Sequence, residues 1–225
     1  DWLKLVIKKI KEVKKRKKIP ILVGGTGLYF KALTDGLSKM PKIPLKIRNQ
    51  IRALHQEIGQ KRFYKQLLKI DPMSVNKIKP NDTHRSLRAY EVKFYTQKSI
   101  NSYFKNTKSN FKEIDFYKIY IDFPRQDLIE RIKLRTEQMI NRGAVNEVKN
   151  FIKLKVKKDK SVNKAIGINE IRQYLKNEKD LHEIIEQISI KTRQYAKRQS
   201  TWARGNMKTW LRLKPKHLNK FLNKI

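Results

Sequence analysis

The spacing of apolar residues changes early in the chain from a helical period to an uninterrupted run. Val6, Ile10 and Val13 recur at helical spacing among lysines, which predicts an amphipathic helix over residues 1–18. Residues 19–23 are bulky and apolar without polar alternation, which is typical of a strand buried on both faces. A helix that leads directly into such a strand favours a doubly wound α/β sheet.

A glycine-rich turn follows this predicted strand, and a helix is expected over residues 28–33. Gly24-Gly25-Thr26-Gly27 would let backbone N–H groups approach a phosphate or a base with no Cβ in the way. The spacing matches neither the P-loop sequence G-x-x-x-x-G-K-[ST] nor the dinucleotide-binding sequence G-x-G-x-x-G. Spacing alone leaves a plain tight turn and a ligand-binding loop equally open.

The patterns that follow predict a helical block between two parts of α/β type. Pro41 and Pro44 disfavour helix and mark a stiff connector. Asp71 and Asp82 are expected to cap helices, with Pro72 at a first helical position. Further helices are predicted over residues 45–58, 61–70, 72–78, 84–97, 128–140, 145–154 and 180–204, strands over 116–123 and 208–213, and a basic tail or terminal helix over 214–225. The predicted parts are a core segment at 1–39, an inserted helical domain at 40–113 and a second core segment at 114–225.

Charge is the feature of composition that bears most on function. Within 225 residues the net charge is +35, which favours polyanionic partners and nucleic acid first among them. The 40 lysines also fit coding bias, so the 15 arginines are the better guides to phosphate contacts. The absence of cysteine excludes disulfides, thiolate metal sites and a cysteine nucleophile, and four scattered histidines argue against a histidine-rich zinc site. No apolar run approaches the ~20 residues of a membrane span, and no signal peptide is evident, so we expect a cytoplasmic chain.

Two pairs of arginines at helical spacing are candidate anion contacts. Arg85 and Arg88 share one helix face. Together they could bind a phosphate or an unstacked base. The alternative is an ordinary solvated helix with an Arg88–Glu91 ion pair. Arg131 and Arg135 lie one turn apart after a predicted strand. They suit a diphosphate, although surface charge is the simpler explanation of this second pair taken alone.

Aromatic and basic residues alternate in the last predicted helix. Tyr195, Arg198 and Trp202 fall on one side of it, a pattern typical of RNA contacts through stacking and phosphate binding. We expect both aromatic rings to be buried and the basic residues to be exposed. No Ser-His-Asp order, carboxylate pair or Walker lysine is visible, so the residues by themselves indicate a basic, RNA-compatible α/β protein without an evident catalytic centre.

Four collinear motifs resemble the tRNA dimethylallyltransferases, also called tRNA isopentenyltransferases. They are Val23-Gly-Gly-Thr-Gly-Leu-Tyr29, the series from Asp71-Pro72 through Asn81-Asp82 to Arg88-Ala-x-Glu-Val92, Ala165-Ile-Gly167, and Ala196-Lys-Arg-Gln-x-Thr-Trp-x-Arg204. The likeness covers about residues 1 to 211. Ile168 departs from a usual Tyr and Ala203 from a usual large apolar residue. The family also opens with a P-loop and a general-base aspartate, both of which would precede Asp1; we therefore expect a truncated form, inactive alone.

The resemblance implies an α/β fold with a P-loop-NTPase-like core of parallel sheet and an inserted helical tRNA-binding domain. It implies Mg²⁺-assisted transfer of a dimethylallyl group from dimethylallyl diphosphate to N6 of the adenine 3′ of the anticodon, by a monomer that binds the anticodon stem-loop and flips the base. Arg131 and Arg135 match diphosphate-facing positions. The tRNA-contact positions are matched by Thr26, Arg48, His84, Arg85, Ser86, Leu87, Arg88, Lys164, Ala165, Ile166, Gly167, Ile168, Asn169, Lys197, Arg198, Gln199, Ser200, Thr201, Trp202, Ala203 and Arg204. A non-catalytic RNA-binding remnant and a decayed product that does not fold stably are the alternatives.

Overall fold

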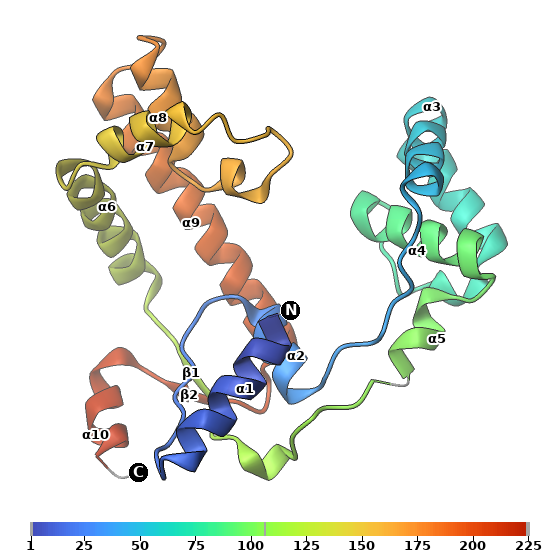
Figure 1. Ribbon diagram of the computed structural model, residues 1–225, viewed down its shortest axis with the longest axis horizontal. Helices are drawn as coiled ribbons and strands as arrows, with labels where there is room; N and C mark the ends of the chain where they lie inside the picture. The colour runs from blue at the N-terminus through green and yellow to red at the C-terminus, as the bar shows by residue number, and fades with distance from the viewer. Residues whose placement is uncertain (1, 106, 224–225) are drawn as a thin grey trace. The chain divides into compact units, whose positions relative to one another are not determined.

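The protein forms two compact units, each described here by itself. The computed structural model describes residues 2–105 and 107–223. One unit consists of the described residues up to Leu22 and of Leu28–Phe116; the other consists of Val23–Gly27 and the described residues from Tyr117 onward (Figure 1). The division predicted from sequence, with boundaries at 39/40 and 113/114, stays a prediction.

Helices and short 3-10 turns make up the first unit. They are α1 (Trp2–Lys15), α2 (Gly27–Thr34, in this unit from Leu28), α3 (Leu45–Ile70), η1 (Pro72–Ser74), α4 (Thr83–Thr96), α5 (Ile100–Lys105) and η2 (Glu113–Asp115). The two helices expected over 45–58 and 61–70 are confirmed as the two halves of α3. They meet at Gly59, whose φ of +73° interrupts the helical backbone.

The helices α3, α4 and α5 enclose a core of their own. Ile43, Leu67, Val92 and Ile100 are buried in one apolar cluster, and burial of such side chains contributes roughly 1.5–3 kcal/mol each. At the start of α4 the Asp82 side chain accepts a hydrogen bond from the backbone N–H of Arg85 at 3.1 Å, which confirms the predicted cap.

The helix predicted over residues 72–78 is wrong, because only one 3-10 turn forms there. Asp71 does not cap it: its buried carboxylate accepts hydrogen bonds from the hydroxyls of Ser74 and Ser99, at 2.8 and 2.9 Å. Val75 then adopts an extended backbone with φ of −57° and ψ of 136°. The carboxylate therefore ties this turn to the start of α5 instead of starting a helix.

The strand predicted over residues 19–23 is also wrong. These residues form no strand in the part of the chain that the structure describes, and Val23 is 93% exposed. Ile19 and Ile21 are exposed as well. An apolar run becomes a buried strand only when neighbouring strands satisfy its backbone and other elements cover its faces, and no described strand pairs with it.

A two-stranded parallel sheet and a group of helices make up the second unit. Its elements are β1 (Ile119–Ile121), α6 (Arg125–Asn141), α7 (Ala144–Lys153), η3 (Ser161–Lys164), α8 (Ile168–Leu175), α9 (Leu181–Asn206), β2 (Leu211–Leu213), η4 (Pro215–His217) and α10 (Leu218–Leu222). Both predicted strands are confirmed in shortened form, and Ile119 pairs with Leu211 in parallel register.

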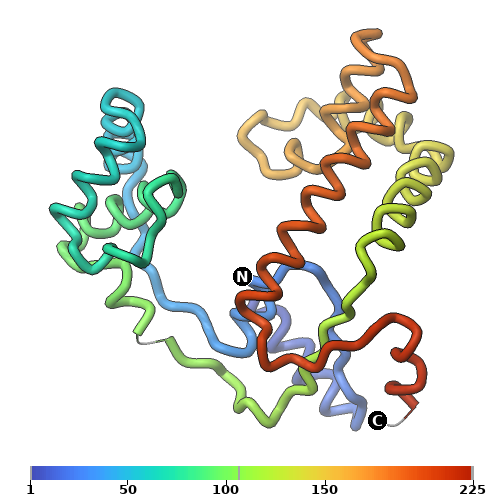
Figure 2. Tube along the Cα trace, turned by 180° about the vertical axis from the view of Figure 1, so that it is seen from behind, coloured from blue at the N-terminus to red at the C-terminus, as the bar shows by residue number. Residues whose placement is uncertain are grey.

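The core of the second unit lies among α6, α7, α8 and α9. Ile140, Val148, Ile171 and Ile184 are buried there together, and α6 runs beside α9 in both views (Figures 1 and 2). The long helix α9 begins at a capping box. There the side chains of Asp180 and Glu183 each accept a hydrogen bond from the other residue's backbone N–H. No helix among the described residues combines the length and the apolar character needed to cross a membrane.

Candidate functional site

A concave site of about 530 Å³ lies within the second unit, between α6, residues 164–166 and α9. It unites three segments that the sequence singled out separately: the arginines of α6, the segment before Gly167 and the aromatic-basic face of α9. From α6 it is lined by Ile132, Arg135, Thr136 and Met139; from the connecting segment by Lys164, Ala165 and Ile166; and from α9 by Ile188, Thr192, Tyr195 and Arg198. We refer to it as the α6–α9 pocket.

The lining residues of both helices are placed by helical periodicity. Their spacing of three and four residues keeps them on one face of each helix. On α6 the Thr136 hydroxyl donates to the carbonyl of Ile132 at 2.9 Å, and on α9 the Thr192 hydroxyl donates to the carbonyl of Ile188 at 2.7 Å. Because each threonine satisfies its polar group within its own helix, its methyl group is left to continue an apolar wall.

Glu170 fixes the turn that carries the third wall. Through Oε2, its buried carboxylate accepts a hydrogen bond from the backbone N–H of Gly167 at 2.8 Å. Through Oε1, it forms an ion pair with Lys191. Gly167 has a φ of +107°, which favours glycine. Burial by itself raises the pKa of Glu170, but the hydrogen bonds from Lys191 and from backbone N–H groups outweigh it and hold the pKa below its usual value.

Sequence reasoning missed this pair. The spacing of Glu170 three residues after Gly167 is that of a helix-capping carboxylate and could have indicated the first contact. The partner Lys191 belongs to another helix, and nothing in the local pattern points to it.

The pocket combines cations with an apolar floor. Arg135, Lys164 and Arg198 contribute positive charge, and no carboxylate lines it among the described residues. The guanidinium of Arg198 also lies 5.6 Å from the ring centre of Tyr195. Such a lining suits an anion that carries a short apolar chain. It does not supply the carboxylate oxygens that Mg²⁺ prefers, so we derive no step through that ion.

The two arginines predicted to face a diphosphate have different surroundings. Arg135 lines the pocket, whereas Arg131 lies over the ring of Phe123, with its guanidinium carbon 5.0 Å from the ring centre. Arg131 is not among the lining residues. Both arginines are exposed, but of the predicted pair only Arg135 lines the pocket.

The glycine turn is close to α9, further along the helix face that lines the pocket. A Cβ at Gly25 would collide with the side chain of Gln199, and a Cβ at Gly27 would collide with the ring of Trp202. Thr26 between them is exposed. The turn needs its glycines because side chains of α9 approach it closely, and this contact presents Thr26 to solvent next to α9.

The last turns of α9 expose their basic residues, as expected. Lys197, Arg198 and Arg204 are exposed, together with Thr201. The expected burial of Tyr195 is wrong, since it is 43% exposed at the pocket rim. The other predicted contact residues of this stretch are less accessible: Gln199, Ser200 and Trp202 are half-buried and Ala203 is buried.

In the first unit, one buried carboxylate gathers three arginines. Glu91 lies 3.7 Å from Nε of Arg48, 4.0 Å from Nε of Arg52 and 3.5 Å from Nη1 of Arg88. Nε of Arg48 is buried and makes no hydrogen bond to the described residues. The Arg88–Glu91 ion pair considered from sequence is therefore present, within a cluster of net positive charge. Sequence reasoning missed Arg52, which helical spacing places one turn after Arg48.

The other predicted contact residues of α4 differ in exposure. His84 and Arg85 are exposed, and Arg85 forms an ion pair with Asp82 at 3.1 Å. Leu87 is half-buried, and Ser86 is fully buried beside Gln60, with 3.3 Å between Ser86 Oγ and Gln60 Nε2. The side chain of Ser86 is therefore part of the core rather than of the surface.

The segment before α8 contributes to two surfaces. Lys164, Ala165 and Ile166 are exposed and line the α6–α9 pocket, while Gly167 is buried and Ile168 half-buried. Asn169 is exposed too, but it lies in a different concavity, between α7 and α8.

Fold and site together define a helix-rich, strongly basic α/β protein with a pocket lined by cations and apolar side chains. A family model described as IPP transferase matches residues 1–206, and the chain belongs to that family. It is 56% identical over 225 residues to the tRNA dimethylallyltransferase of Pelagibacter ubique, covering all of this chain and 72% of that protein. It is 40% identical to the tRNA dimethylallyltransferase of Rickettsia massiliae, covering 92% of this chain and 57% of the relative.

Solved structures agree with this membership. A tRNA isopentenylpyrophosphate transferase from Bacillus halodurans is 30% identical with a TM-score of 0.59, over 95% of this chain and 66% of that one. A eukaryotic dimethylallyltransferase acting on tRNA gives a TM-score of 0.69 at 28% identity, over 88% of this chain and 50% of that one. The resemblance noted from sequence and the mixed α/β fold are confirmed. The chain spans between half and about three quarters of the length of these relatives.

Proposed function

We propose that the protein takes part in transferring a dimethylallyl group from dimethylallyl diphosphate to N6 of the adenine 3′ of the anticodon in tRNA. The α6–α9 pocket is the observation that carries this proposal. It combines three cations with an apolar floor, and its walls come from the segments that the family resemblance assigns to diphosphate and tRNA. A prenyl diphosphate has the matching chemistry, with one strongly anionic end and one short branched hydrocarbon end.

Within this pocket, Arg135 is positioned to neutralise the diphosphate. A guanidinium can hold two phosphate oxygens at once, and its charge offsets the negative charge that grows on the leaving group. The apolar side chains of Ile132, Met139 and Ile166 provide contacts for the five-carbon chain. Arg131 is assigned to the diphosphate on the resemblance alone, because it lies against Phe123.

In the reaction, the N6 lone pair of adenine attacks the terminal allylic carbon of the dimethylallyl group. The bond between that carbon and the bridging oxygen breaks, and its electron pair leaves with the diphosphate. N6 then loses one proton, so the products are the N6-dimethylallyl adenine, diphosphate and a proton. Arg135 acts on the leaving group, and none of the pocket's residues is assigned to the proton.

The RNA side of the site lies along α9 and the two segments next to it. On the family resemblance, the proposed contacts for the nucleotides around a flipped adenine are Thr26 in the glycine turn, Lys164 at the pocket and the exposed cations Lys197 and Arg204. In the first unit, the arginine cluster around Glu91 is the proposed contact for the anticodon stem-loop. On the family resemblance we propose in addition a P-loop-NTPase-like core, action as a monomer and a cytoplasmic location. The resemblance also implies Mg²⁺ as a cofactor, but the residues that line this pocket do not supply its ligands.

The test is a transfer assay with labelled dimethylallyl diphosphate and unmodified tRNA. Because the chain aligns with 72% of the Pelagibacter ubique relative, the assay compares the 225-residue chain with a hybrid in which it replaces the matching part of that relative. We expect the hybrid to label tRNA at that adenine. We expect the chain alone, which contains no G-x-x-x-x-G-K-[ST] sequence, to leave the RNA unlabelled.

A matched variant links the outcome to the pocket. Arg135→Gln in the hybrid should lower transfer at least tenfold, since a charge-assisted hydrogen bond contributes about 1.5–3 kcal/mol. A hybrid that folds and binds tRNA but transfers nothing would indicate an RNA-binding protein instead. Label found in RNA incubated with the chain alone would refute our expectation for the chain, and leave the proposed reaction standing.

A further inference from the structure

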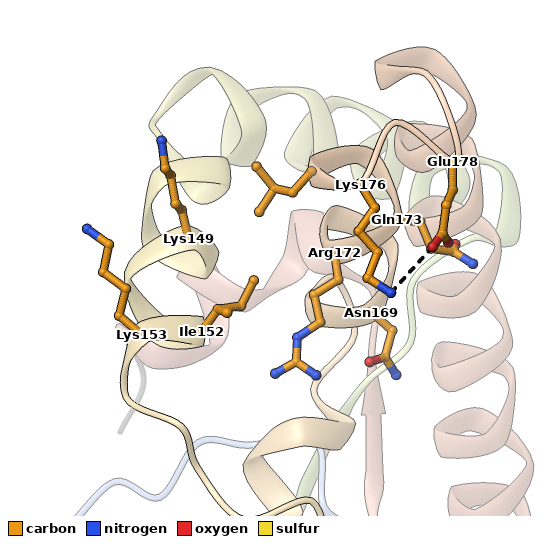
Figure 3. A pocket seen from close by; sticks show the side chains of 9 residues that line it. Lys149, Ile152, Lys153, Asn169, Arg172, Gln173, Lys176 and Glu178 are labelled. Atoms are coloured by element: carbon orange, nitrogen blue, oxygen red, sulfur yellow. Dashed lines mark ion pairs between the residues drawn. The ribbon is translucent and has the colours of Figure 1, made fainter.

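A second concave surface lies in the second unit, on the outer side of the helix pair α7 and α8. It encloses about 890 Å³, and Figure 3 shows the side chains that line it. From α7 it is lined by Lys149 and Lys153, which lie one turn apart. From α8 it is lined by Asn169 and Arg172, which lie three residues apart, and Lys176 at the C-cap of α8 continues this lining. None of these five residues lines the α6–α9 pocket.

This surface carries a clear excess of positive charge. Four of its lining residues are cations, and Glu178 is the single carboxylate among them. Glu178 forms an ion pair with Lys176 at 3.4 Å, which leaves Lys149, Lys153 and Arg172 without an acidic neighbour in the lining (Figure 3). Ile152 and Leu175 form an apolar floor between the two helices.

Arg172 distinguishes this surface from the general lysine coat of the protein. Its Nε is buried and has no hydrogen-bond partner among the described residues. One end of its guanidinium donates to Oδ1 of Asn163 at 3.3 Å, and the guanidinium lies 5.9 Å from the ring centre of Phe151. In Figure 3 the group projects toward the space between Ile152 and Asn169. These contacts orient the group beside the concavity, whereas a solvated surface lysine has no fixed orientation.

One short stretch of sequence contributes residues both to this surface and to the α6–α9 pocket. Residues 164–166 line the α6–α9 pocket and Asn169 lines the α7–α8 concavity, so one short segment borders both. Glu170 holds this segment by accepting a hydrogen bond from the backbone N–H of Gly167. The two surfaces therefore belong to the same unit and meet at this short segment of the chain.

We propose that the α7–α8 concavity binds the phosphodiester backbone of the same RNA whose adenine enters the α6–α9 pocket. This inference rests on the proposed function for the identity of the RNA. The cations are distributed along two helices instead of converging on one point, which suits a row of phosphates better than a single small anion. The side-chain amides of Asn169 and Gln173 can bond ribose hydroxyls, and the apolar floor can contact the sugar faces.

The test measures the affinity for an unmodified tRNA transcript over a range of salt concentrations. Lys149→Gln combined with Lys153→Gln removes two cations at exposed positions without touching the core. The control is Lys214→Gln combined with Lys216→Gln, which removes the same charge from an exposed segment of the same unit. Each lost phosphate contact reduces the slope of the logarithm of the binding constant against the logarithm of the salt concentration by about 0.7–0.9 in magnitude. The first double variant should therefore reduce this slope by about 1.5 and bind about 10- to 30-fold more weakly near 0.15 M salt.

Three outcomes are distinguished. A selective loss of slope in the Lys149/Lys153 variant, with the control like wild type, supports the backbone site. Equal effects in both double variants would overturn it, because the lysines would then act only through net charge. A loss of binding to inorganic diphosphate with unchanged tRNA affinity would also overturn it, in favour of a small-anion site. Since these measurements involve no transfer step, they stand apart from the transfer assay that tests the proposed function.

Discussion

The indole ring of Trp202 occupies the space in which a Cβ of residue 27 would lie. This relationship joins the glycine turn to α9 and explains why a residue without a side chain is required at the first position of α2. The φ of Gly27 is not positive, so the requirement is one of space and not of backbone conformation.

Gly27→Ala should therefore destabilise the protein. Forcing a methyl group against the ring displaces either Trp202 or the turn, which costs about 1–3 kcal/mol. The measurement is urea unfolding followed by circular dichroism. Gly205→Ala is the matched control, because it lies in α9 with nothing within 4 Å of a new Cβ, and Ala there should be neutral or stabilising by up to about 1 kcal/mol. Equal stability of the two variants would show that the turn yields without cost.

Glu170→Gln should destabilise the second unit in a pH-dependent manner. The folded-state pKa of Glu170 lies below its usual value, so its charged form stabilises the fold above the unfolded pKa, near 4.5. That contribution is lost as the pH falls through the folded-state pKa. At pH 7 we expect Glu170→Gln to lower the free energy of unfolding by about 1–3 kcal/mol, because the Gly167 N–H and Lys191 lose a charged acceptor.

Urea unfolding of wild type and Glu170→Gln at a series of pH values from 3 to 8 should show the two curves converging as the pH falls below about 4.5. Glu178→Gln is the control, because this exposed residue forms an ion pair with Lys176 and with no other described residue. Its substitution should change the free energy of unfolding by less than about 0.5 kcal/mol. A difference between wild type and Glu170→Gln that stays constant across this range would contradict the assigned role of the charge.

Arg85→Ala and Arg88→Ala should separate RNA affinity from stability. Arg85 is exposed, and among the described residues its ion pair is with Asp82 alone. Its loss should therefore weaken tRNA binding while changing the free energy of unfolding by less than about 0.5 kcal/mol. Arg88 is a neighbour of the buried carboxylate of Glu91, so its loss should also destabilise the protein by about 1–2 kcal/mol. Filter binding at two salt concentrations and urea unfolding give the two readouts. Unchanged tRNA affinity in both variants would exclude this face of α4 as a contact.

Arg135→Gln and Arg131→Gln should differ in their effect on the prenyl donor. Arg135 lines the pocket, whereas Arg131 is held over Phe123. We expect the first change to weaken binding of an unreactive dimethylallyl diphosphate analogue by about tenfold or more, and the second by a smaller factor. Calorimetric titration with the hybrid protein measures both. A larger loss for Arg131→Gln would assign the diphosphate to the other side of α6.

Helices and the basic face of α9 were predictable from sequence because their signals are local. The periods of three and four residues and the cap at Asp82 depend on neighbours in the chain, as does the interruption between the helices predicted over 128–140 and 145–154. The apolar run at residues 19–23 has the local signal of a strand, but strand formation depends on partners elsewhere, which the run does not encode.

The site was predictable in its parts and not in its assembly. Arg135, Lys164 and Arg198 were each singled out from their own segments, but only the structure shows that they line one pocket. Lys191 and Arg52 were missed because each meets a carboxylate from another helix. The surroundings of Arg131 and Tyr195 depend on how α6 and α9 pack, and the pattern of one helix contains no information about its neighbour's surface.

The pairing of β1 with β2 has a consequence for how the protein is made. Ile119 pairs with Leu211, so the sheet can form only after the whole helical segment between the two strands has been synthesised. Contacts between residues so distant in sequence slow folding, because a long loop must be closed before any hydrogen bond compensates for it. On the ribosome, α6 and α9 can become helical as they emerge, whereas the sheet must wait until β2 has been synthesised. The second unit is therefore expected to complete its fold only after β2 has been made, and the intermediate with an unpaired β1 is the form most exposed to aggregation.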